Sequence, residues 1–164
     1  MKKLSLIILT YNSEKDIYDC LSSVYQYNDI GDALEIIVVD NNSEHYARMQ
    51  DKLSTLYPKV NIISNSTNGG YGQGNNIGIQ SASAPIVSIM NPDVRLVMPI
   101  FQRIINIFED QEIVMCGGKQ YKNATTPAIS FCCDYHRNAL LQSIGISYYR
   151  KQDISIYFNF TLFR

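Results

Sequence analysis

Four polar clusters in this sequence contain residue types that could do chemistry. They are Thr-Tyr-Asn at 10–12, Asp-Asn-Asn-Ser at 40–43, a run of glycines and asparagines at 68–78, and Asn-Pro-Asp at 91–93. A buried carboxylate such as Asp40 needs hydrogen-bond donors, and a ribose hydroxyl or a base N–H would serve. Glycines let the backbone approach a ligand closely. A carboxylate at 93 could hold Mg²⁺ together with substrate phosphates.

Each cluster also has a purely structural interpretation. Residues 40–43 can form a turn that caps the next helix, run 68–78 can be a flexible connector, and 91–93 can start a helix. The run fits neither familiar phosphate motif, because no Lys follows in a GK[ST] arrangement and no three glycines have the G-x-G-x-x-G spacing. The first cluster is followed by Ser-Glu-Lys without glycine, which disfavours an NAD-binding dehydrogenase.

The hydrophobic pattern predicts the elements that must position these clusters. Almost continuous apolar runs predict buried strands, and apolar residues at i, i+3, i+4 and i+7 predict amphipathic helices, the first of them capped by Ser13. The expected strands are 3–10, 34–39, 60–64 and 85–90, and the expected helices are 13–27, one through Met49, Leu53 and Leu56 that stops before Pro58, 77–84, and 98–110.

This alternation predicts an α/β fold, a mostly parallel Rossmann-like sheet with helices on both faces. Right-handed crossovers bring the carboxyl ends of all the strands to one edge, where open α/β sheets bind their ligands. Each of the four clusters follows a predicted strand directly or within a few residues. We therefore expect them to share one rim of the sheet.

Length and composition limit what the chain can be. Its 164 residues suit one domain, and 46% hydrophobic residues supply a core. A net charge of -1 argues against nucleic acid as the main ligand.

Four cysteines without metal-site spacing, Cys20, Cys116, Cys132 and Cys133, suggest reduced and mostly buried thiols. No run reaches the roughly 18 apolar residues that span a bilayer. We expect a cytoplasmic protein.

The last part of the chain is less informative. Residues 154–162 alternate apolar and polar side chains, as in a half-buried strand. The sequence stops at Arg164 directly after this segment, so we expect a chain that is cut short. The expected organisation is a ligand-binding part at 1–118 and the incomplete start of a second region at 119–164.

Taken in order, the segments LSLIILTYNSEKDIYDCLSSV (4–24), EIIVVDNNS (35–43), NGGYGQGNNIGI (68–79) and SIMNPDV (88–94) resemble the family 2 glycosyltransferases, and among them the bacterial rhamnosyltransferase-like members. The resemblance implies a GT-A type fold that binds a nucleoside diphosphate sugar donor, with Mg²⁺ or Mn²⁺ bridging the diphosphate.

The resemblance also assigns roles to individual residues. Asp93 matches the last acid of the family's Asp-x-Asp metal motif, whose first acid is here Asn91, so a single carboxylate remains. Residues 10–12 match the loop against the nucleoside. The full set matched to the nucleotide sugar is Thr10, Tyr11, Asn12, Asp40, Asn42, Asn68, Gly70, Asn75, Asn76 and Asn91.

The reaction implied is direct displacement at the anomeric carbon with inversion, in which a carboxylate removes the acceptor's proton and the metal offsets charge on the departing diphosphate. No residue fits the family's base motif; Asp134 is a weak candidate. UDP- or dTDP-sugars, dTDP-rhamnose among them, are the implied donors. The implied acceptor is a glycan or lipid-linked glycan in bacterial polysaccharide synthesis, which would place the protein peripherally at the inner face of the membrane.

Two other functions stay open from the sequence alone. A sugar nucleotidyltransferase shares the substrate class, but residues 10–15 lack its glycine-rich basic loop. A non-catalytic partner-binding or sugar-nucleotide-binding domain would explain the missing base. The oligomeric state is not readable from the sequence.

Overall fold

Four strands form one parallel sheet in the computed structural model, which describes residues 1–118 and 146–150. They are β1 (Leu4–Thr10), β2 (Leu34–Asp40), β3 (Asn61–Ser64) and β4 (Ile86–Met90), in the order β3-β2-β1-β4. β1 and β2 are the central strands and are buried almost throughout, as their continuous apolar runs predict. Because all three pairings are parallel, the four carboxyl ends meet at one edge, as the sequence predicts.

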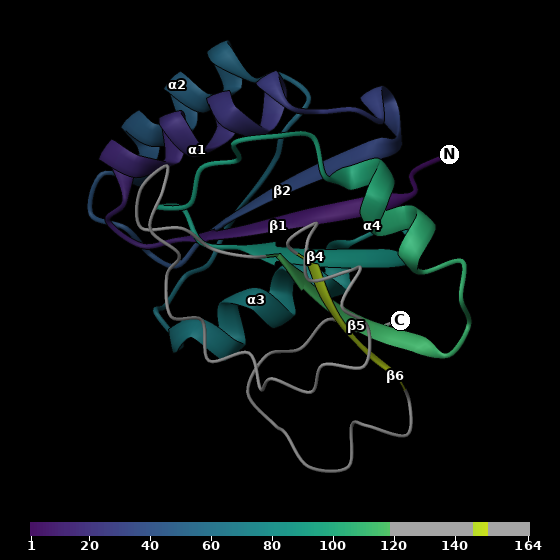
Figure 1. The fold of residues 1–164 in the computed structure, drawn as a ribbon. Helices are drawn as coiled ribbons and strands as arrows, with labels where there is room; N and C mark the ends of the chain where they lie inside the picture. The colour runs from purple at the N-terminus through teal and green to yellow at the C-terminus, as the bar shows by residue number, and fades with distance from the viewer. Residues whose placement is uncertain (119–145, 151–164) are drawn as a thin grey trace, which may run out of the picture. The chain divides into compact units, whose positions relative to one another are not determined.

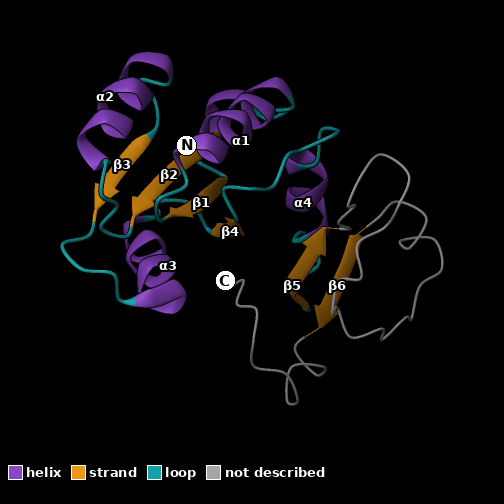
Figure 2. Ribbon diagram, turned by 90° about the vertical axis from the view of Figure 1, so that its left-hand side faces the viewer, coloured by secondary structure: helices purple, strands orange, loops and turns teal. Residues whose placement is uncertain are grey.

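Helices cover both faces of this sheet. They are α1 (Glu14–Gln26), α2 (Tyr46–Leu56), α3 (Gly70–Ser81) and α4 (Phe101–Ile107), with a short 3-10 turn at Gly31–Ala33. α1 and α2 lie side by side on one face and α3 lies on the other (Figures 1 and 2). The predicted α/β architecture is therefore confirmed, with α4 shorter than the expected 98–110.

The two faces of the sheet carry separate apolar clusters, because successive side chains of a strand point to opposite sides. Leu4, Leu6 and Ile8 of β1 pack with α1, α2 and Phe101 of α4. Ile7, between them in sequence, belongs to the cluster on the α3 side. The other buried members of that cluster are Ile37, Val39 and Val87. The helices are thus held by both faces of the same two central strands.

The glycine-rich run is the clearest departure from the sequence prediction. We expected a loop to residue 77 and a helix at 77–84, but α3 already begins at Gly70 and ends at Ser81. A Cβ at Gly74 would lie 2.3 Å from Leu9 Cδ1, and one at Gly78 would lie 2.5 Å from Ile7 Cγ2. These two glycines, four residues apart, let the helix backbone lie close against β1. Helix packing therefore overrides the poor helix propensity of glycine.

The order in which strands are added to the sheet reverses beside β1. The chain moves from β1 outward through β2 to β3, and then returns to place β4 on the other side of β1. The residues that follow β1 and β4 therefore lie next to each other at the carboxyl edge of the sheet. Such a switch point is where open α/β sheets bind ligands, and here it lies between residues 10–12 and 91–93.

Residues 106–163 form a second compact unit, of which 106–118 and 146–150 are described. Its two strands, β5 (Ile113–Gly118) and β6 (Ile146–Arg150), pair antiparallel with a shift of register between Ile113 and Met115. The strand predicted at 154–162 lies outside the described residues.

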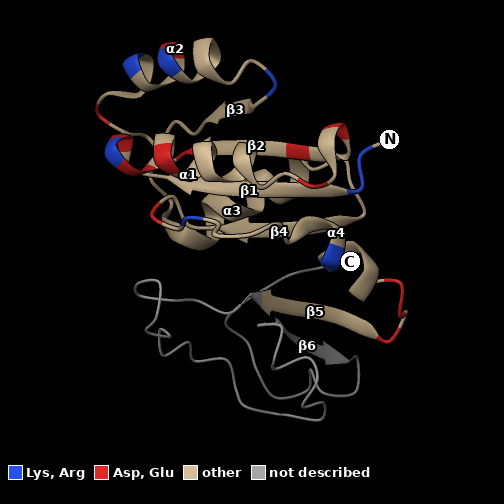
Figure 3. Ribbon diagram, turned by 45° about the horizontal axis from the view of Figure 1, so that its top comes forward, with Lys and Arg blue, Asp and Glu red and all other residues tan. Residues whose placement is uncertain are grey.

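Charged residues lie mainly on helices and loops, and few lie on the strands (Figure 3). In the described part of the chain no helix is long and apolar enough to cross a membrane. Cys20 and Cys116 are buried free thiols, as expected, and burial raises the pKa of Cys20 to about 12. Cys132 and Cys133 lie outside the described residues.

A carboxylate fastens the connection from α3 to β4 at the amino end of the sheet. Glu35 in β2 accepts hydrogen bonds from the Ser5 hydroxyl, the Ser83 backbone N–H (2.8 Å) and the Ser83 hydroxyl (2.9 Å). Burial alone would raise the pKa of Glu35, but these bonds and the charge of Lys2 lower it below the ordinary value. The ionised form of Glu35 therefore stabilises the fold.

We predict a pH dependence of stability from Glu35. Because its pKa is lower in the folded chain than in the unfolded one, its contribution is complete above the ordinary glutamate pKa of about 4.3 and disappears as the pH falls through the folded value. The free energy of unfolding of Glu35→Gln should therefore be lower than wild type at pH 6, and the gap should close towards pH 3 in urea titrations. Glu44→Gln, at an exposed site, is the control and should show no such gap.

A second prediction tests the packing of α3. Gly78→Ala should lower the free energy of unfolding by about 1–3 kcal/mol, because the new methyl meets the stiff β-branched side chains of Ile7 and Val39. Gly72→Ala in the same helix has open space around the new Cβ, so it should be neutral or slightly stabilising. Equal effects of the two substitutions in urea unfolding would contradict this account.

Candidate functional site

The loop after β2 is organised around the Asp40 carboxylate. Asp40 is fully buried, and its oxygens accept hydrogen bonds from the Ser43 backbone N–H (2.9 Å) and the Ser43 hydroxyl. These are the contacts of the turn that the sequence allowed as the structural interpretation of residues 40–43. A contact from Asp40 to a nucleotide remains a prediction.

The loops after β1 and β2 are bonded directly to each other. The Asn12 backbone N–H donates to the Ser43 hydroxyl oxygen (2.8 Å), and the Glu44 N–H donates to the Asn12 side-chain oxygen (3.0 Å). Asn12 and Asn42 have φ of 51° and 68°, the left-handed region that asparagine tolerates better than most residues. In the described ranges they are the non-glycine residues with positive φ. Both mark the same rim.

Asn41 joins this pair of loops to the start of α3, a role that our sequence analysis missed. Its buried amide N–H₂ donates to Asn68 Oδ1 (2.6 Å) and to the Gly70 carbonyl (3.3 Å). Its side-chain oxygen accepts from Asn65 Nδ2 (3.0 Å). Asn68 Oδ1 also accepts the Gly70 N–H (3.0 Å). A strand-end asparagine followed by further asparagines after the next strand was the available signal.

Two predicted site residues keep hydrogen-bonding capacity unused. Thr10 Oγ1 and Asn75 Oδ1 are buried, and within residues 1–118 and 146–150 no side chain or backbone group bonds them. The Asn75 N–H₂ group is used, since it donates to the Tyr71 carbonyl (2.9 Å). Unpaired buried polar atoms are costly and uncommon. They occur here at the end of β1 and within the first half of α3.

Asn91, Pro92 and Asp93 follow β4 beside the end of β1. Ile8 pairs with Met90, so this turn leaves the sheet next to residues 10–12. Asn91 and Asp93 are exposed at the rim. The turn closes on itself through the Val94 N–H, which donates to the Asn91 carbonyl (3.2 Å). The fourth cluster thus lies beside the first, as predicted.

The predicted site residues divide by exposure. Thr10, Asp40 and Asn75 are buried. The exposed ones are Tyr11, Asn12, Asn42, Asn68, Gly70, Asn76, Asn91 and Asp93. The exposed set can touch a ligand directly, and of the buried set Asp40 bonds within its own loop. Asp134 lies outside the described residues.

The residues after β4 fit a hard divalent cation that is completed by a ligand. Across the described ranges there is no group of three or more His, Cys, Asp or Glu side chains that could hold a metal by itself. Mg²⁺, however, is usually held by one or two carboxylates together with substrate phosphates and waters. The Asp93 carboxylate, with the Asn91 amide oxygen near it in sequence, offers oxygen donors of that kind on exposed residues.

The family model for glycosyl transferase family 2 matches residues 5–160. The chain belongs to glycosyl transferase family 2. The family resemblance drawn from the four sequence clusters is therefore confirmed at this level.

Individual relatives agree with this membership. Glycosyltransferase AglE of Haloferax volcanii is 26% identical over 129 residues, which covers 76% of this chain and 42% of that protein. The low-salt glycan biosynthesis hexosyltransferase Agl10 of the same organism is 32% identical over 97 residues, 57% of this chain and 28% of that protein. This family 2 chain thus spans less than half the length of these two curated relatives.

Solved structures share the fold. The mannosyltransferase PcManGT from Pyrobaculum calidifontis, in complex with GDP-Man and Mn²⁺, superposes with a TM-score of 0.63 at 19% identity and covers 73% of this chain and 36% of that one. TarS of S. aureus in complex with UDP gives a TM-score of 0.64 at 22% identity, over 78% of this chain and 38% of that one. The expected α/β fold of the GT-A type is confirmed.

We predict that Asn41 holds the rim together. Asn41→Ala should lower the free energy of unfolding by about 1–3 kcal/mol, because it removes one buried partner from Asn65, Asn68 and the Gly70 carbonyl. Asn42→Gly is the matched control, because the Asn42 side chain is exposed and glycine adopts the same positive φ without strain. Urea unfolding of both variants checks this, and a comparable loss in Asn42→Gly would refute it.

Proposed function

We propose that this family 2 chain forms the donor-binding part of an inverting glycosyltransferase that uses a nucleoside diphosphate sugar. The observation that carries the proposal is the rim itself. The loops after β1 and β2 and the start of α3 are bonded into one unit by Asn12, Ser43 and Asn41, and the exposed Asp93 follows β4 across the switch point.

The two sides of the switch point suit the two ends of such a donor. On the side of β2, the exposed side-chain N–H₂ groups of Asn12, Asn42 and Asn68 offer neutral donors for a base and a ribose. On the side of β4, Asp93 offers a carboxylate for a divalent cation that the diphosphate would complete. We therefore place the nucleoside against residues 10–12 and 40–43, and the diphosphate with Mg²⁺ or Mn²⁺ at Asp93.

The proposed chemistry is a single displacement. The acceptor hydroxyl oxygen attacks the anomeric carbon, the bond from that carbon to the diphosphate oxygen breaks, and the acceptor's proton passes to a carboxylate base. Attack opposite the leaving group inverts the anomeric centre. A bound divalent cation would offset the charge that develops on the departing nucleoside diphosphate. Asp134 remains the candidate base within this chain.

Donor and acceptor are proposed by family likeness. The Asn-Pro-Asp form of residues 91–93 favours a rhamnosyltransferase-like member, with dTDP-rhamnose or another UDP- or dTDP-sugar as donor. PcManGT carries GDP-Man and TarS carries UDP in their structures, so GDP compounds belong among those tested. We propose a glycan or lipid-linked glycan acceptor at the cytoplasmic face of a bacterial membrane.

The experiment is calorimetry of this chain with UDP, dTDP, GDP and their sugars, with and without Mg²⁺ or Mn²⁺. We expect one nucleoside diphosphate to bind, and its affinity to rise with the cation. In Asp93→Asn the cation should no longer raise the nucleotide affinity. This loss should exceed the roughly tenfold loss of metal affinity that follows removal of an outer-shell partner of a metal.

Asp51→Asn supplies the control, since Asp51 is an exposed carboxylate on α2. Its binding should match wild type. Metal-dependent binding would remove the non-catalytic partner-binding alternative. Release of pyrophosphate from an NTP and a sugar phosphate would instead favour a nucleotidyltransferase. Failure of wild type to bind any of these compounds would count against the proposal as a whole.

A further inference from the structure

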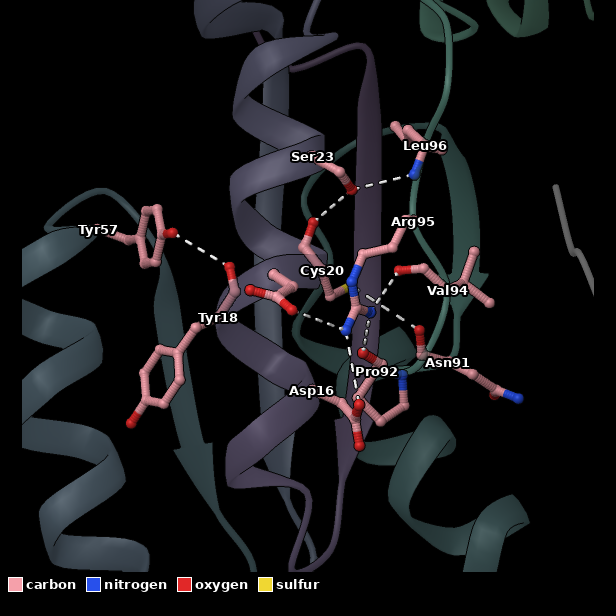
Figure 4. Close-up of polar contacts among 11 residues, drawn as sticks. Asp16, Tyr18, Cys20, Ser23, Tyr57, Asn91, Pro92, Val94, Arg95 and Leu96 are labelled. Carbon is pink, nitrogen blue, oxygen red and sulfur yellow. Dashed lines mark hydrogen bonds and ion pairs between the residues drawn. The ribbon is translucent and has the colours of Figure 1, made fainter. Parts of the chain in front are cut away.

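The segment that carries Asp93 is fastened along α1 by contacts on both sides of that residue (Figure 4). Before it, the Cys20 thiol donates to the Asn91 carbonyl (3.8 Å). After it, the Leu96 N–H donates to the Ser23 hydroxyl oxygen (3.0 Å), and that hydroxyl donates to the Cys20 carbonyl (2.7 Å). α1 therefore acts as a template for residues 91–96, although it is far from them in sequence.

Arg95 makes the contacts nearest to Asp93. Its Nη1 donates to the Pro92 carbonyl (2.9 Å) and to the Val94 carbonyl (3.1 Å). These are the residues immediately before and after Asp93. One guanidinium nitrogen thus spans the backbone from which the Asp93 carboxylate projects.

The other end of the same guanidinium rests on α1. Arg95 Nη2 lies 3.5 Å from Asp16 Oδ1 and 3.6 Å from Asp19 Oδ2. Asp16 and Asp19 are three residues apart, so they share one face of the helix. The arginine side chain is 31% exposed, less than either carboxylate. It is therefore seated between helix and turn.

The charges argue against a direct role of Arg95 in binding phosphate. Two carboxylates already face this single cation, and both of its terminal nitrogens, Nη1 and Nη2, contact protein oxygens. Exposed ion pairs contribute little to stability. Four contacts of one side chain on a surface turn are better explained by a role in positioning that turn.

We propose that Arg95, held by Asp16 and Asp19, is a positioning residue that fixes the turn at 91–94 and so holds the Asp93 carboxylate at the rim. The inference rests on the proposed function, in which Asp93 binds the cation of the donor complex. It adds α1 to the parts of the chain that set the affinity for that cation.

The geometry requires arginine. A planar guanidinium can direct one nitrogen to two carbonyls and another to two carboxylates, whereas the single nitrogen of lysine cannot serve both groups at those positions. Arg95→Lys keeps the positive charge but loses the planar group with two terminal nitrogens. It therefore separates positioning from electrostatics.

The test measures nucleoside diphosphate binding by calorimetry at a series of Mn²⁺ concentrations. It compares the wild-type chain with Arg95→Lys. We expect the apparent Mn²⁺ affinity to fall by about tenfold, as for other outer-shell partners of metal ligands, while the affinity for the nucleotide without metal stays unchanged. The double variant Asp16→Asn, Asp19→Asn should change the titration in the same direction, because Arg95 then loses its seat on α1.

Lys59→Ala is the matched control. It removes an exposed ion pair with Asp32 (2.8 Å) at a distance from the rim, and should leave both affinities unchanged. Amide hydrogen exchange measured by NMR adds a readout that needs no ligand: Val94 and Leu96 should exchange faster in Arg95→Lys and not in Lys59→Ala.

The outcomes separate the two proposals. If wild type binds with metal dependence and Arg95→Lys binds equally well, only the role of Arg95 is overturned. Equal loss of metal-free and metal-dependent affinity in Arg95→Lys would show a general structural effect and would also overturn it. If wild type itself binds no nucleoside diphosphate, the proposed function fails and the role of Arg95 fails with it.

Discussion

The parallel pairing of β1 with both β2 and β4 is the constraint on which the rest of the site depends. It brings the loop after each strand to one edge, and it places the loops after β1 and β4 on the two sides of the switch point. β1 can occupy this central place because its side chains are apolar on both faces, Leu6 and Ile8 on one and Ile7 on the other. The buried polar residue Ser5 of the same strand is accommodated by its hydrogen bonds to Glu35 and to the Ala84 N–H.

Most of the hydrogen bonds that join the loops of the rim involve asparagine residues. Asn12 and Asn41 each both donate and accept, so a single side chain or residue can close contacts in two directions. Carboxylates in these places would only accept hydrogen bonds, and would repel a diphosphate. The one buried carboxylate of the rim, Asp40, is occupied by Ser43. Asp93 is exposed after β4, and under the proposed function its carboxylate would share a cation with the phosphates of the donor.

The loops on the two sides of the switch point are held in place by different contacts. On the side of β2, the loops hold one another by hydrogen bonds, and α3 lies close to β1 because Gly74 and Gly78 have no side chains. On the side of β4, the turn is held by α1, which lies on the face of the sheet opposite α3. Cys20 and Ser23 of α1 bond the backbone of the turn, and Arg95 pairs with the acids of α1. Burial keeps Cys20 a neutral thiol and therefore a donor, since its pKa is raised to about 12.

The sequence alone predicted the strands β1 to β4, the helices between and after them, and their order, because an apolar run or a helical stripe is a local property of the chain. It did not predict β5 and β6. It also determined which polar clusters would share a rim, since parallel strands allow one arrangement of their ends, and the four ordered clusters identified the family. Only the tertiary structure decided the course of residues 70–77, where a helix forms against local propensity because close packing on Leu9 and Ile7 favours it. It likewise decided the partners of Asn41 and Arg95. Those partners lie 24 or more residues away for the Asn41 contacts, and 76 or more for the acids of α1, and contacts at such separations arise from packing that no local pattern encodes.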